Sequence, residues 1–258
     1  MPLMRPGLIA ATSAGIAGRL PIPDTGRVAR RPIIVFAGLG IVAYTLAMLA
    51  TMPASVVLKN RPWRTGVAGT IWNGEVGVAG GSKLEWQMAP LRSLTSLGFA
   101  ADWKATGPDT DMGGRMLVHP TGRTVLDKVS GTADGRLLQA LQPGLPFTCD
   151  LTMQIDMDRI AVGGGDQMLA GKAASDPGSC RPKTGSAAAS PLPPLLLTAE
   201  PIGGRTTLRI VPAGQRRQVL VQAELSENGT LDLSVTPQGA AMMPFLGLPP
   251  GVRIQGAL

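Results

Sequence analysis

The sequence is short of aromatic residues, histidine, cysteine and charge. Of its 258 residues only 3% are aromatic and 16% are charged, with one histidine and two cysteines. A core must therefore be built mainly from Val, Leu, Ile, Ala and Met. The 34 glycines and 23 prolines divide the chain into short segments, so long helices are not expected beyond one N-terminal stretch. The length suits one or two domains.

The lone histidine, His119, limits the chemistry that the chain can perform. It precedes Pro120 and has no neighbours at metal-ligand spacing, so a structural role is favoured over a catalytic one. An envelope hydrolase would need a polar cluster around His119, and no Gly-x-Ser-x-Gly motif occurs. We therefore expect no enzyme activity, no cofactor and no metal.

Two further polar features are weak evidence for a functional site. Asp156 and Asp158 share the polar face of an alternating segment, which leaves metal or acid/base chemistry open but favours a solvated face. The glycine-rich residues 162–167, VGGGDQ, lack the spacing and the Lys-Ser/Thr pair of a phosphate-binding loop. They are expected to permit a bulge or a tight turn.

Residues 33–52 form the longest uncharged apolar run, because no charge occurs between Arg31 and Lys59. Twenty residues at 1.5 Å per residue span about 30 Å, the thickness of the hydrocarbon layer of a bilayer. The alternatives are a buried core helix and a cleaved signal peptide, whose apolar segment usually has about 7 to 15 residues. We predict one uncleaved transmembrane helix.

Positive charge before this run predicts its orientation. Residues 1–32 hold five arginines and one acidic residue, and short positive flanks stay in the cytoplasm. We predict a cytoplasmic basic tail (1–32), a span (33–52) and an exported β-rich domain (53–258). Lys59, Arg61 and Arg64 follow the span closely, so they weaken the difference in positive charge between its two flanks without reversing it.

The two cysteines, Cys149 and Cys180, both follow the span. They belong to no Cys-x-x-Cys pair and to no Cys/His ligand set. A disulfide formed in an oxidising compartment is the simplest interpretation, and closing a loop of about 30 residues would stabilise the fold by roughly 3 to 4 kcal/mol. Two buried, reduced thiols are the alternative.

The net charge of +7 suggests nucleic-acid binding until the charge is divided along the chain. Residues 1–32 have a net charge of +4, whereas the remainder holds 19 basic and 16 acidic residues. A nearly balanced domain is a poor phosphate binder, and a basic tail beside a span suits anionic lipid. We expect membrane lipid as a partner, no nucleic acid and no small-molecule substrate.

Short segments with alternating apolar and polar residues predict a mostly antiparallel, curved β-domain after the span. Residues 83–88 and 99–104 alternate in this way. Residues 148–157, TCDLTMQIDM, predict one strand whose apolar face includes Cys149. The clearest hairpin is 219–235, where Asn228-Gly229 is interpreted as a type I′ turn that needs positive φ at both residues.

Four other segments complete the expected architecture. Residues 90–98 and 134–144 predict one or two short helices. In each segment leucines recur near helical spacing, after Pro90 or Asp134 at the start and before a glycine at the end. Residues 173–198 are rich in Pro, Ala and Ser and are predicted to form a loop. The apolar stretch 242–258 is expected either to pack across an opening of the core, which is favoured, or to bind a partner.

A motif in the first part of the domain, GTIWNG at 69–74, is followed by further Trp and Pro positions. This pattern, over most of residues 33–240, resembles the type II secretion system protein N family (general secretion pathway protein N). Cys149 and Cys180 are similar to that family's two cysteines. The motif positions are Gly69, Thr70, Trp72, Asn73, Gly74, Trp86, Pro90 and Trp103. From the residues alone we expect structural roles: turns at the glycines and buried area at the tryptophans.

The resemblance implies a single-pass protein of the cell inner membrane with a cytoplasmic N-terminus and a periplasmic C-terminal domain. It would be a non-enzymatic accessory component of the apparatus that exports folded proteins across the outer membrane. Its partners would be other type II secretion components, in the inner-membrane platform or the outer-membrane secretin. The alternative is a periplasmic lipid or lipophile carrier, because a curved sheet with one apolar face could hold acyl chains.

Overall fold

The computed structural model describes residues 30–58, 64–184 and 188–257. Most of the predicted basic tail, residues 1–29, and also Lys59 and Arg61 lie outside the described residues. The chain divides between Leu49 and Ala50 into two compact units.

The described part of the first unit consists of helix α1, Arg30–Ala50, whose last residue is the first of the second unit. Its stretch Ile33–Ala50 has a mean hydropathy of 2.4 and is long and apolar enough to cross a membrane. None of these side chains is buried, which argues against the core-helix alternative because a core helix buries its apolar surface. The helix ends two residues before Met52, the predicted limit, since a residue that precedes proline disfavours helical geometry.

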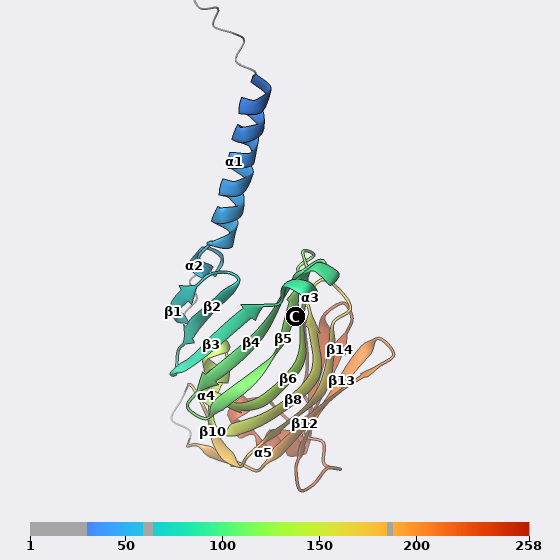
Figure 1. Cartoon of the computed structure of the whole chain (residues 1–258). Helices are drawn as coiled ribbons and strands as arrows, with labels where there is room; N and C mark the ends of the chain where they lie inside the picture. Colours follow the sequence, from blue (N-terminus) through green and yellow to red (C-terminus); the bar gives the residue numbers. More distant parts are fainter. Residues whose placement is uncertain (1–29, 59–63, 185–187, 258) are drawn as a thin grey trace, which may run out of the picture. The chain divides into compact units, whose positions relative to one another are not determined.

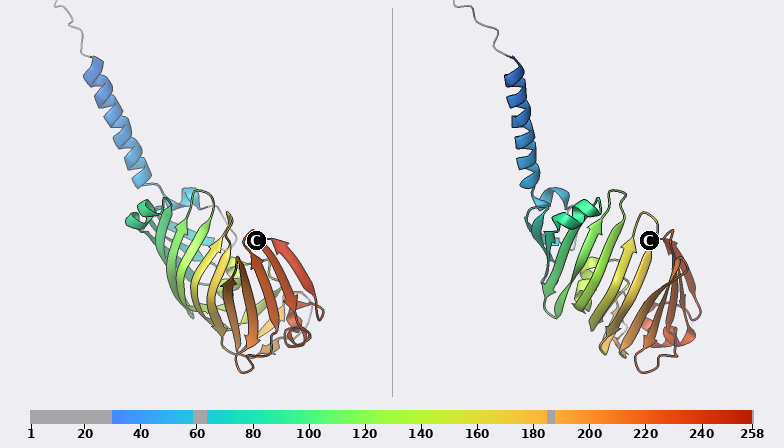
Figure 2. Two further views of the ribbon diagram at one scale, coloured as in Figure 1. Left: turned by 90° about the vertical axis from the view of Figure 1, so that its right-hand side faces the viewer. Right: turned by 45° about the vertical axis from the view of Figure 1, so that its right-hand side comes forward.

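The second unit is dominated by one antiparallel sheet of 13 strands, which confirms the predicted mainly β fold. Strands adjacent in this sheet follow chain order, and the sheet curls strongly (Figures 1 and 2). Its strands are β1 Arg64–Gly69, β2 Asn73–Val78, β3 Ser82–Met88, β4 Phe99–Gly107, β5 Thr110–Val118, β6 Thr124–Asp134, β8 Thr152–Val162, β9 Met168–Ser175, β12 Leu195–Ile202, β13 Arg205–Pro212, β14 Val221–Ser226, β15 Thr230–Val235 and β16 Arg253–Ala257.

The alternation of side chains gives this sheet an apolar inner face and a polar outer face. Cross-strand pairs show the division: Trp86 faces Trp103 on the inside, whereas Glu85 faces Lys104 on the outside. Register shifts interrupt the pairing of β5 with β6 and of β8 with β9. Bulges of this kind bend strands and increase their twist, which accounts for part of the curl.

The inside of the curl holds most of the remaining elements (Figure 1). A small antiparallel sheet has the order β11-β10-β7, and short helices pack beside it. The bounds are β7 Phe147–Asp150, β10 Gly178–Pro182, β11 Ser190–Leu192, α4 Gly135–Leu141, α5 Pro237–Met242 and η1 Pro244–Leu246. Two further helices lie at the ends of large-sheet strands: α2 Ala54–Val57 and α3 Pro90–Thr95. The predicted short helices at 90–98 and 134–144 are thus confirmed as α3 and α4.

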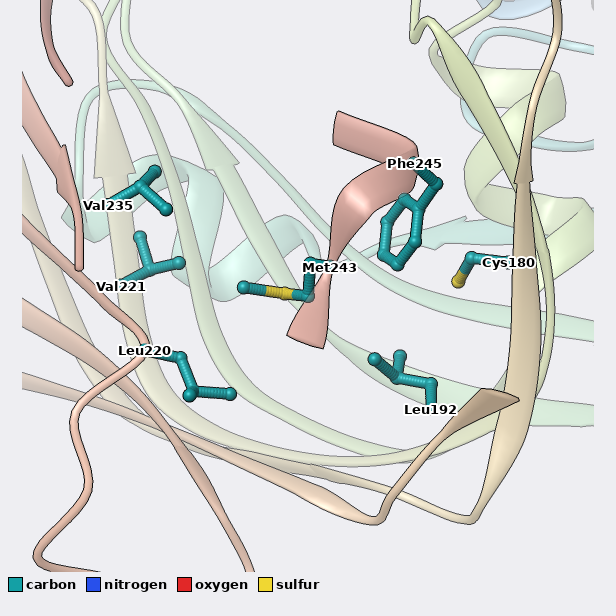
Figure 3. Close-up of a cluster of buried hydrophobic side chains, with 7 residues drawn as sticks. All are labelled: Cys180, Leu192, Leu220, Val221, Val235, Met243 and Phe245. Atoms are coloured by element: carbon teal, nitrogen blue, oxygen red, sulfur yellow. The ribbon is translucent and has the colours of Figure 1, made fainter. Parts of the chain in front are cut away.

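The C-terminal apolar stretch packs into the core, as favoured from the sequence. Met243 and Phe245 are buried between the large sheet and the small one, where Figure 3 shows them between Val221 on one side and Leu192 on the other. The rings of Phe245 and Phe147 meet edge to face with centroids 5.2 Å apart. The segment after η1 then leads into β16, which pairs with β15.

The predicted single strand 148–157 is wrong in one respect, because it breaks at Leu151. Residues before the break belong to β7 in the small sheet, and residues after it belong to β8 in the large sheet. The carbonyl of Leu151 accepts a hydrogen bond from the N–H of Gly135 at the start of α4, and its side chain packs against the core around Phe245. These contacts turn the chain from one sheet to the other.

The predicted loop 173–198 is also only partly correct. The segment includes the end of β9, all of β10 and β11, and the start of β12, with residues 185–187 outside the described part. Its composition suggested a loop, but Cys180 and Leu192 are buried and their burial stabilises the small sheet. Pro191 lies in β11, an edge strand, where a missing backbone N–H is tolerated.

The hairpin predicted at 219–235 is confirmed as β14 and β15, but its turn is of another type. Of the two residues Asn228 and Gly229, only Gly229 has a positive φ, 86°. Its N–H donates to the carbonyl of Ser226 at 2.9 Å, while Asn228 Oδ1 accepts from the N–H of Thr230 at 3.0 Å. A longer loop with one left-handed glycine also matches strand twist.

Candidate functional site

The motif at 69–74 forms the tight turn between β1 and β2. The N–H of Thr70 donates to the carbonyl of Asn73 at 2.8 Å, and the N–H of Asn73 donates to Thr70 Oγ1 at 3.2 Å. Gly69 has φ 84°, and a Cβ there would lie 2.5 Å from the carbonyl oxygen of Asn73. Both the φ angle and the close approach favour glycine.

The turn is bound to two other parts of the domain through its backbone. The N–H of Ile71 donates to the carbonyl of Met52 at 3.1 Å, and Thr70 bridges to Pro53. On the other side, Trp86 Nε1 donates to the carbonyl of Ile71 at 3.1 Å. The motif therefore ties residues 52–53, which follow α1 in the chain, to β3.

The tryptophans explain the second motif glycine. A Cβ at Gly74 would lie 2.5 Å from Cζ2 of Trp86, so the indole ring occupies the space that a side chain would need. Trp86 faces Trp103 on β4, whose buried indole nitrogen has no hydrogen-bond partner among the described residues. Trp72 contacts Phe99 with ring centroids 6.4 Å apart. The aromatic residues therefore connect β2, β3 and β4.

Pro90, the remaining motif position, starts α3. It stands in the first turn, where a missing N–H costs nothing. The preceding residues bind the sheet: the N–H of Met88 donates to the carbonyl of Trp72 at 2.7 Å, and that of Ala89 donates to the carbonyl of Ala100 at 2.8 Å. We refer to the connected turn, residues 52–53, Trp86 and the start of α3 as the motif corner.

An open depression of about 650 Å³ lies over β1 to β4 beside the motif corner. Five motif residues line it: Gly69, Asn73, Gly74, Trp86 and Trp103. Its charged lining consists of Glu75, Glu85, Asp102 and Lys104. Three of these side chains are acidic and one is basic, so the charged lining does not favour an anionic ligand.

The outer face near this depression carries one perturbed group. The hydrogen bond from Lys83 Nζ to Glu85 Oε1, at 2.5 Å, raises the pKa of Lys83 above its usual 10.5. A raised lysine pKa contributes stability below pH 10.5 that is lost as the pH rises through the raised value. The pair is exposed and screened by solvent, so its contribution is small.

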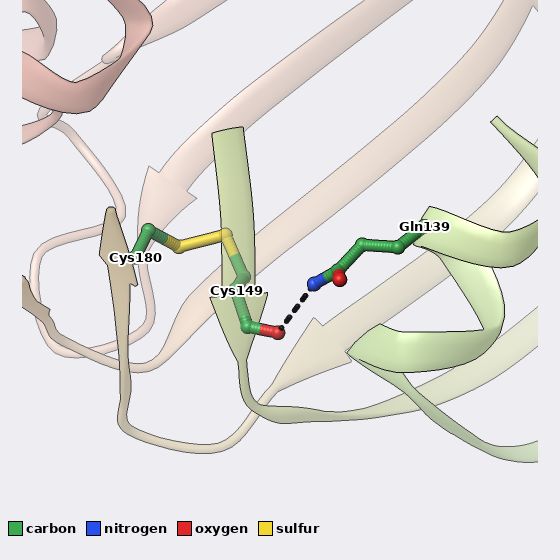
Figure 4. Close-up of a disulfide and its surroundings, with 3 residues drawn as sticks. All are labelled: Gln139, Cys149 and Cys180. Atoms are coloured by element: carbon green, nitrogen blue, oxygen red, sulfur yellow. Dashed lines mark hydrogen bonds between the residues drawn. A yellow bond between two sulfur atoms is a disulfide. The ribbon is translucent and has the colours of Figure 1, made fainter. Parts of the chain in front are cut away.

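The disulfide joins Cys149 of β7 to Cys180 of β10, neighbouring strands of the small sheet. The two residues are 31 apart in sequence. Gln139 of α4 donates from Nε2 to the carbonyl of Cys149 at 3.2 Å (Figure 4). The disulfide thus joins two strands of the small sheet, and the Gln139 hydrogen bond connects that sheet to α4.

The other candidate residues are dispersed. His119 closes the β5–β6 turn through its backbone, with its N–H donating to the carbonyl of Arg123. Asp156 pairs with Lys172 at 3.5 Å on the outer face, and residues 162–167 form the β8–β9 turn. Within residues 30–58, 64–184 and 188–257, no three His, Cys, Asp or Glu side chains are grouped so that they could hold a metal ion.

The structure thus brings the predicted motif residues together and leaves the two cysteines apart from them. Sequence reasoning missed Met52 and Pro53, which take part through backbone groups. Such contacts do not depend on side-chain identity, so the sequence carries no signal for them.

Replacing Gly69 with alanine is expected to lower the free energy of unfolding by about 2 kcal/mol, because an L side chain at this φ is strained and its Cβ crowds the carbonyl of Asn73. Gly66 is the matched control in the same strand, since a Cβ there meets nothing within 4 Å. Urea denaturation of the two variants measures the difference. Equal stability would contradict the role assigned to Gly69.

Comparisons of this chain with protein-family models, with curated proteins and with solved structures find no match.

Proposed function

We propose that the protein is a membrane-anchored, non-enzymatic accessory component of a type II secretion system. It holds a rigid β-domain next to the inner membrane, where that domain contacts other components of the apparatus. The observation that carries the proposal is the motif corner: its family-motif residues tie the sheet to the chain that leaves α1, which is an architectural role.

The anchor and the compartment support this function. Ile33–Ala50 can cross a membrane by length and composition, and the arginines before it favour a cytoplasmic N-terminus. The disulfide between Cys149 and Cys180 suits an oxidising compartment. A single-pass protein with its β-domain in the periplasm meets these conditions.

A free sheet edge supplies a physical means of docking. β16 ends the 13-stranded sheet and pairs only with β15 among the described residues. Its residues 253–256 are exposed, so backbone groups on its outer side are accessible. An exposed edge of this kind can accept an additional strand from a partner protein.

A second candidate function is lipophile binding, and one observation favours it. The inner face is covered by α4 at one end and by Met243 and Phe245 at the other. Between them, Val129, Met157 and Ala199 are buried, but the apolar side chains packed against these three are only partly buried: Trp103, Met112, Leu126, Ile155, Ile160, Leu169, Leu197 and Leu208. A surface of this composition suits acyl chains.

Photo-cross-linking in cells at native expression separates the two functions. A photoreactive residue in place of Gln255 on β16 is expected to capture secretion-apparatus components. A photoreactive residue in place of Glu200, which is exposed on the outer face of β12, is the control and should not capture them. Capture of no secretion component from Gln255 would contradict the proposed docking edge. A third position, Leu197, reports on the alternative: lipid cross-linked there would favour a carrier.

A further inference from the structure

Exposed apolar side chains are concentrated near the motif corner. In the described part of the second unit, eight large apolar side chains are exposed: Val56, Val57, Leu91, Leu94, Leu97, Leu138, Ile202 and Ile254. Five of the eight belong to α2 and to residues 90–97, which we call the α3 segment; the residues just before each of them bind the motif turn. Single exposed leucines need no explanation, but a cluster of them indicates a surface that contacts something apolar.

The three leucines of the α3 segment are the most exposed. Leu91, Leu94 and Leu97 are 79%, 73% and 82% exposed. Leu91 and Leu94, three residues apart, occupy neighbouring positions on α3, and Leu97 follows just after the helix ends. Together they present a compact apolar surface on the outside of the domain.

The α3 segment is held firmly while its leucines face solvent. Ser93 Oγ accepts the N–H of Ala100 at 2.9 Å, and Arg92 pairs with Asp102 at 2.6 Å. The polar residues between the leucines thus bind the sheet. The leucines contribute little to the core, so the folded domain does not account for their presence.

Leu97 adds an independent indication. It follows the C-terminal cap of α3 with φ 48°, a left-handed conformation that helices usually assign to glycine or asparagine at this position. A leucine there costs backbone strain and exposes apolar surface at the same time. Strained residues that the fold does not require point to function.

The chain itself indicates what these leucines contact. α1 ends at Ala50, and the carbonyl of Met52 is bound to the motif turn. Two residues of extended chain reach at most about 7 Å. The boundary of a bilayer that holds α1 is therefore close to the motif corner. The α3 helix belongs to the same corner, because it begins two residues after Met88, whose N–H is bound to the carbonyl of Trp72.

We propose that Leu91, Leu94 and Leu97 insert into the surface of the lipid bilayer in which α1 is anchored. The inference rests on the anchoring part of the proposed function and goes beyond it by assigning a second membrane contact. Apolar side chains of short segments bind at the boundary between headgroups and acyl chains. Val56 and Val57 are also exposed, in α2 within a few residues of α1 in the chain.

A fluorescent probe at position 94 tests this contact in the full chain. Both native cysteines are in the disulfide, so the Leu94→Cys variant labels at one thiol. The Ala213→Cys variant is the control, because Ala213 is exposed in the β13–β14 connection at the opposite end of the strands. Each protein is reconstituted into phosphatidylcholine and phosphatidylglycerol vesicles with or without lipids that carry a quencher high in the acyl chain.

The probe at 94 is expected to lose about half of its fluorescence in quencher vesicles, as for a group at the headgroup boundary, while the probe at 213 is unchanged. Adding Leu91→Gln and Leu97→Gln to the Leu94→Cys chain is expected to abolish the quenching, which shows that the native leucines, rather than the probe, drive insertion. These residues are exposed, so the disulfide and the sheet should form normally in this variant.

Three results would overturn the inference. Equal quenching at 94 and 213, in protein that resists alkaline extraction from the vesicles, would reject the leucine contact while leaving the anchor intact. Extraction of the whole chain by alkali would reject both the anchor and the contact. A probe at 94 that is shielded in native membranes but unquenched in pure lipid would identify a protein as the occupant.

Discussion

Replacing Phe245 with alanine is expected to lower the free energy of unfolding of the β-domain by about 3 to 5 kcal/mol. Phe245 is buried between the two sheets and touches Phe147 edge to face. Alanine would leave a cavity at the junction that joins β7, β10 and η1 to the last strands of the large sheet. Denaturant unfolding followed by tryptophan fluorescence measures the change.

A matched control and a second variant sharpen this test. Leu91→Ala removes a large side chain that is almost fully exposed, so its effect on unfolding should stay within about 0.5 kcal/mol. A double-mutant cycle with Phe147→Leu should show a coupling energy of about 0.5 to 1.5 kcal/mol for the ring pair. A loss below 1 kcal/mol for Phe245→Ala would mean that the C-terminal segment does not close the core.

Removing the disulfide is expected to have a comparable effect. A loop closed over a sequence separation of 31 residues corresponds to about 3 to 4 kcal/mol on the chain-entropy model. The double variant Cys149→Ala, Cys180→Ala should therefore unfold about 10 °C lower, given about 2 to 4 °C per kcal/mol for a domain of this size. Thermal unfolding followed by circular dichroism measures the shift.

Reduced wild-type protein is the matched comparison for this variant. Both lack the covalent link, so their midpoints should agree, and oxidised wild type should lie well above them. Because Cys180 is buried in the core with Phe245, reductant should act on the folded protein slowly. Identical midpoints for oxidised protein and for the double variant would show that the small sheet is held by packing alone.

The sequence was sufficient to predict which types of secondary structure the protein contains. The uncharged run from Ile33 predicted α1, and alternation predicted an antiparallel sheet because the period of two is a direct consequence of strand geometry. Asn228-Gly229 located the last hairpin correctly. Local patterns of this kind are informative because each depends only on residues that are close in the chain.

Features that depend on distant residues were not predicted correctly. The break at Leu151 follows from the contact with Gly135 and from packing near Phe245, neither of which alters the alternation of residues 148–157. The segment 173–198 has the composition of a loop but gains strands from pairing and burial. The turn type at Asn228 differs because loop length and strand twist, rather than the dipeptide alone, decide it.

The candidate site shows the same limit. The motif glycines were expected to serve turns or close backbone approach, and their surroundings in the structure have that character. The partner of the turn, Met52, could not be identified, because a carbonyl is present in every residue. The leucines of α3 were seen as a helical pattern, yet their outward direction depends on how Arg92 and Ser93 bind the sheet.

The chain-order arrangement of the large sheet has a consequence for how the domain assembles. Each strand of the large sheet pairs with the strand of that sheet before it in the chain, so most pairings are local and most loop closures are short. A chain that emerges N-terminus first can add one strand at a time to a growing edge. The packing of Phe245 against Cys180 and Leu192 joins residues that are far apart in the chain, so we expect it to form after most strands have paired.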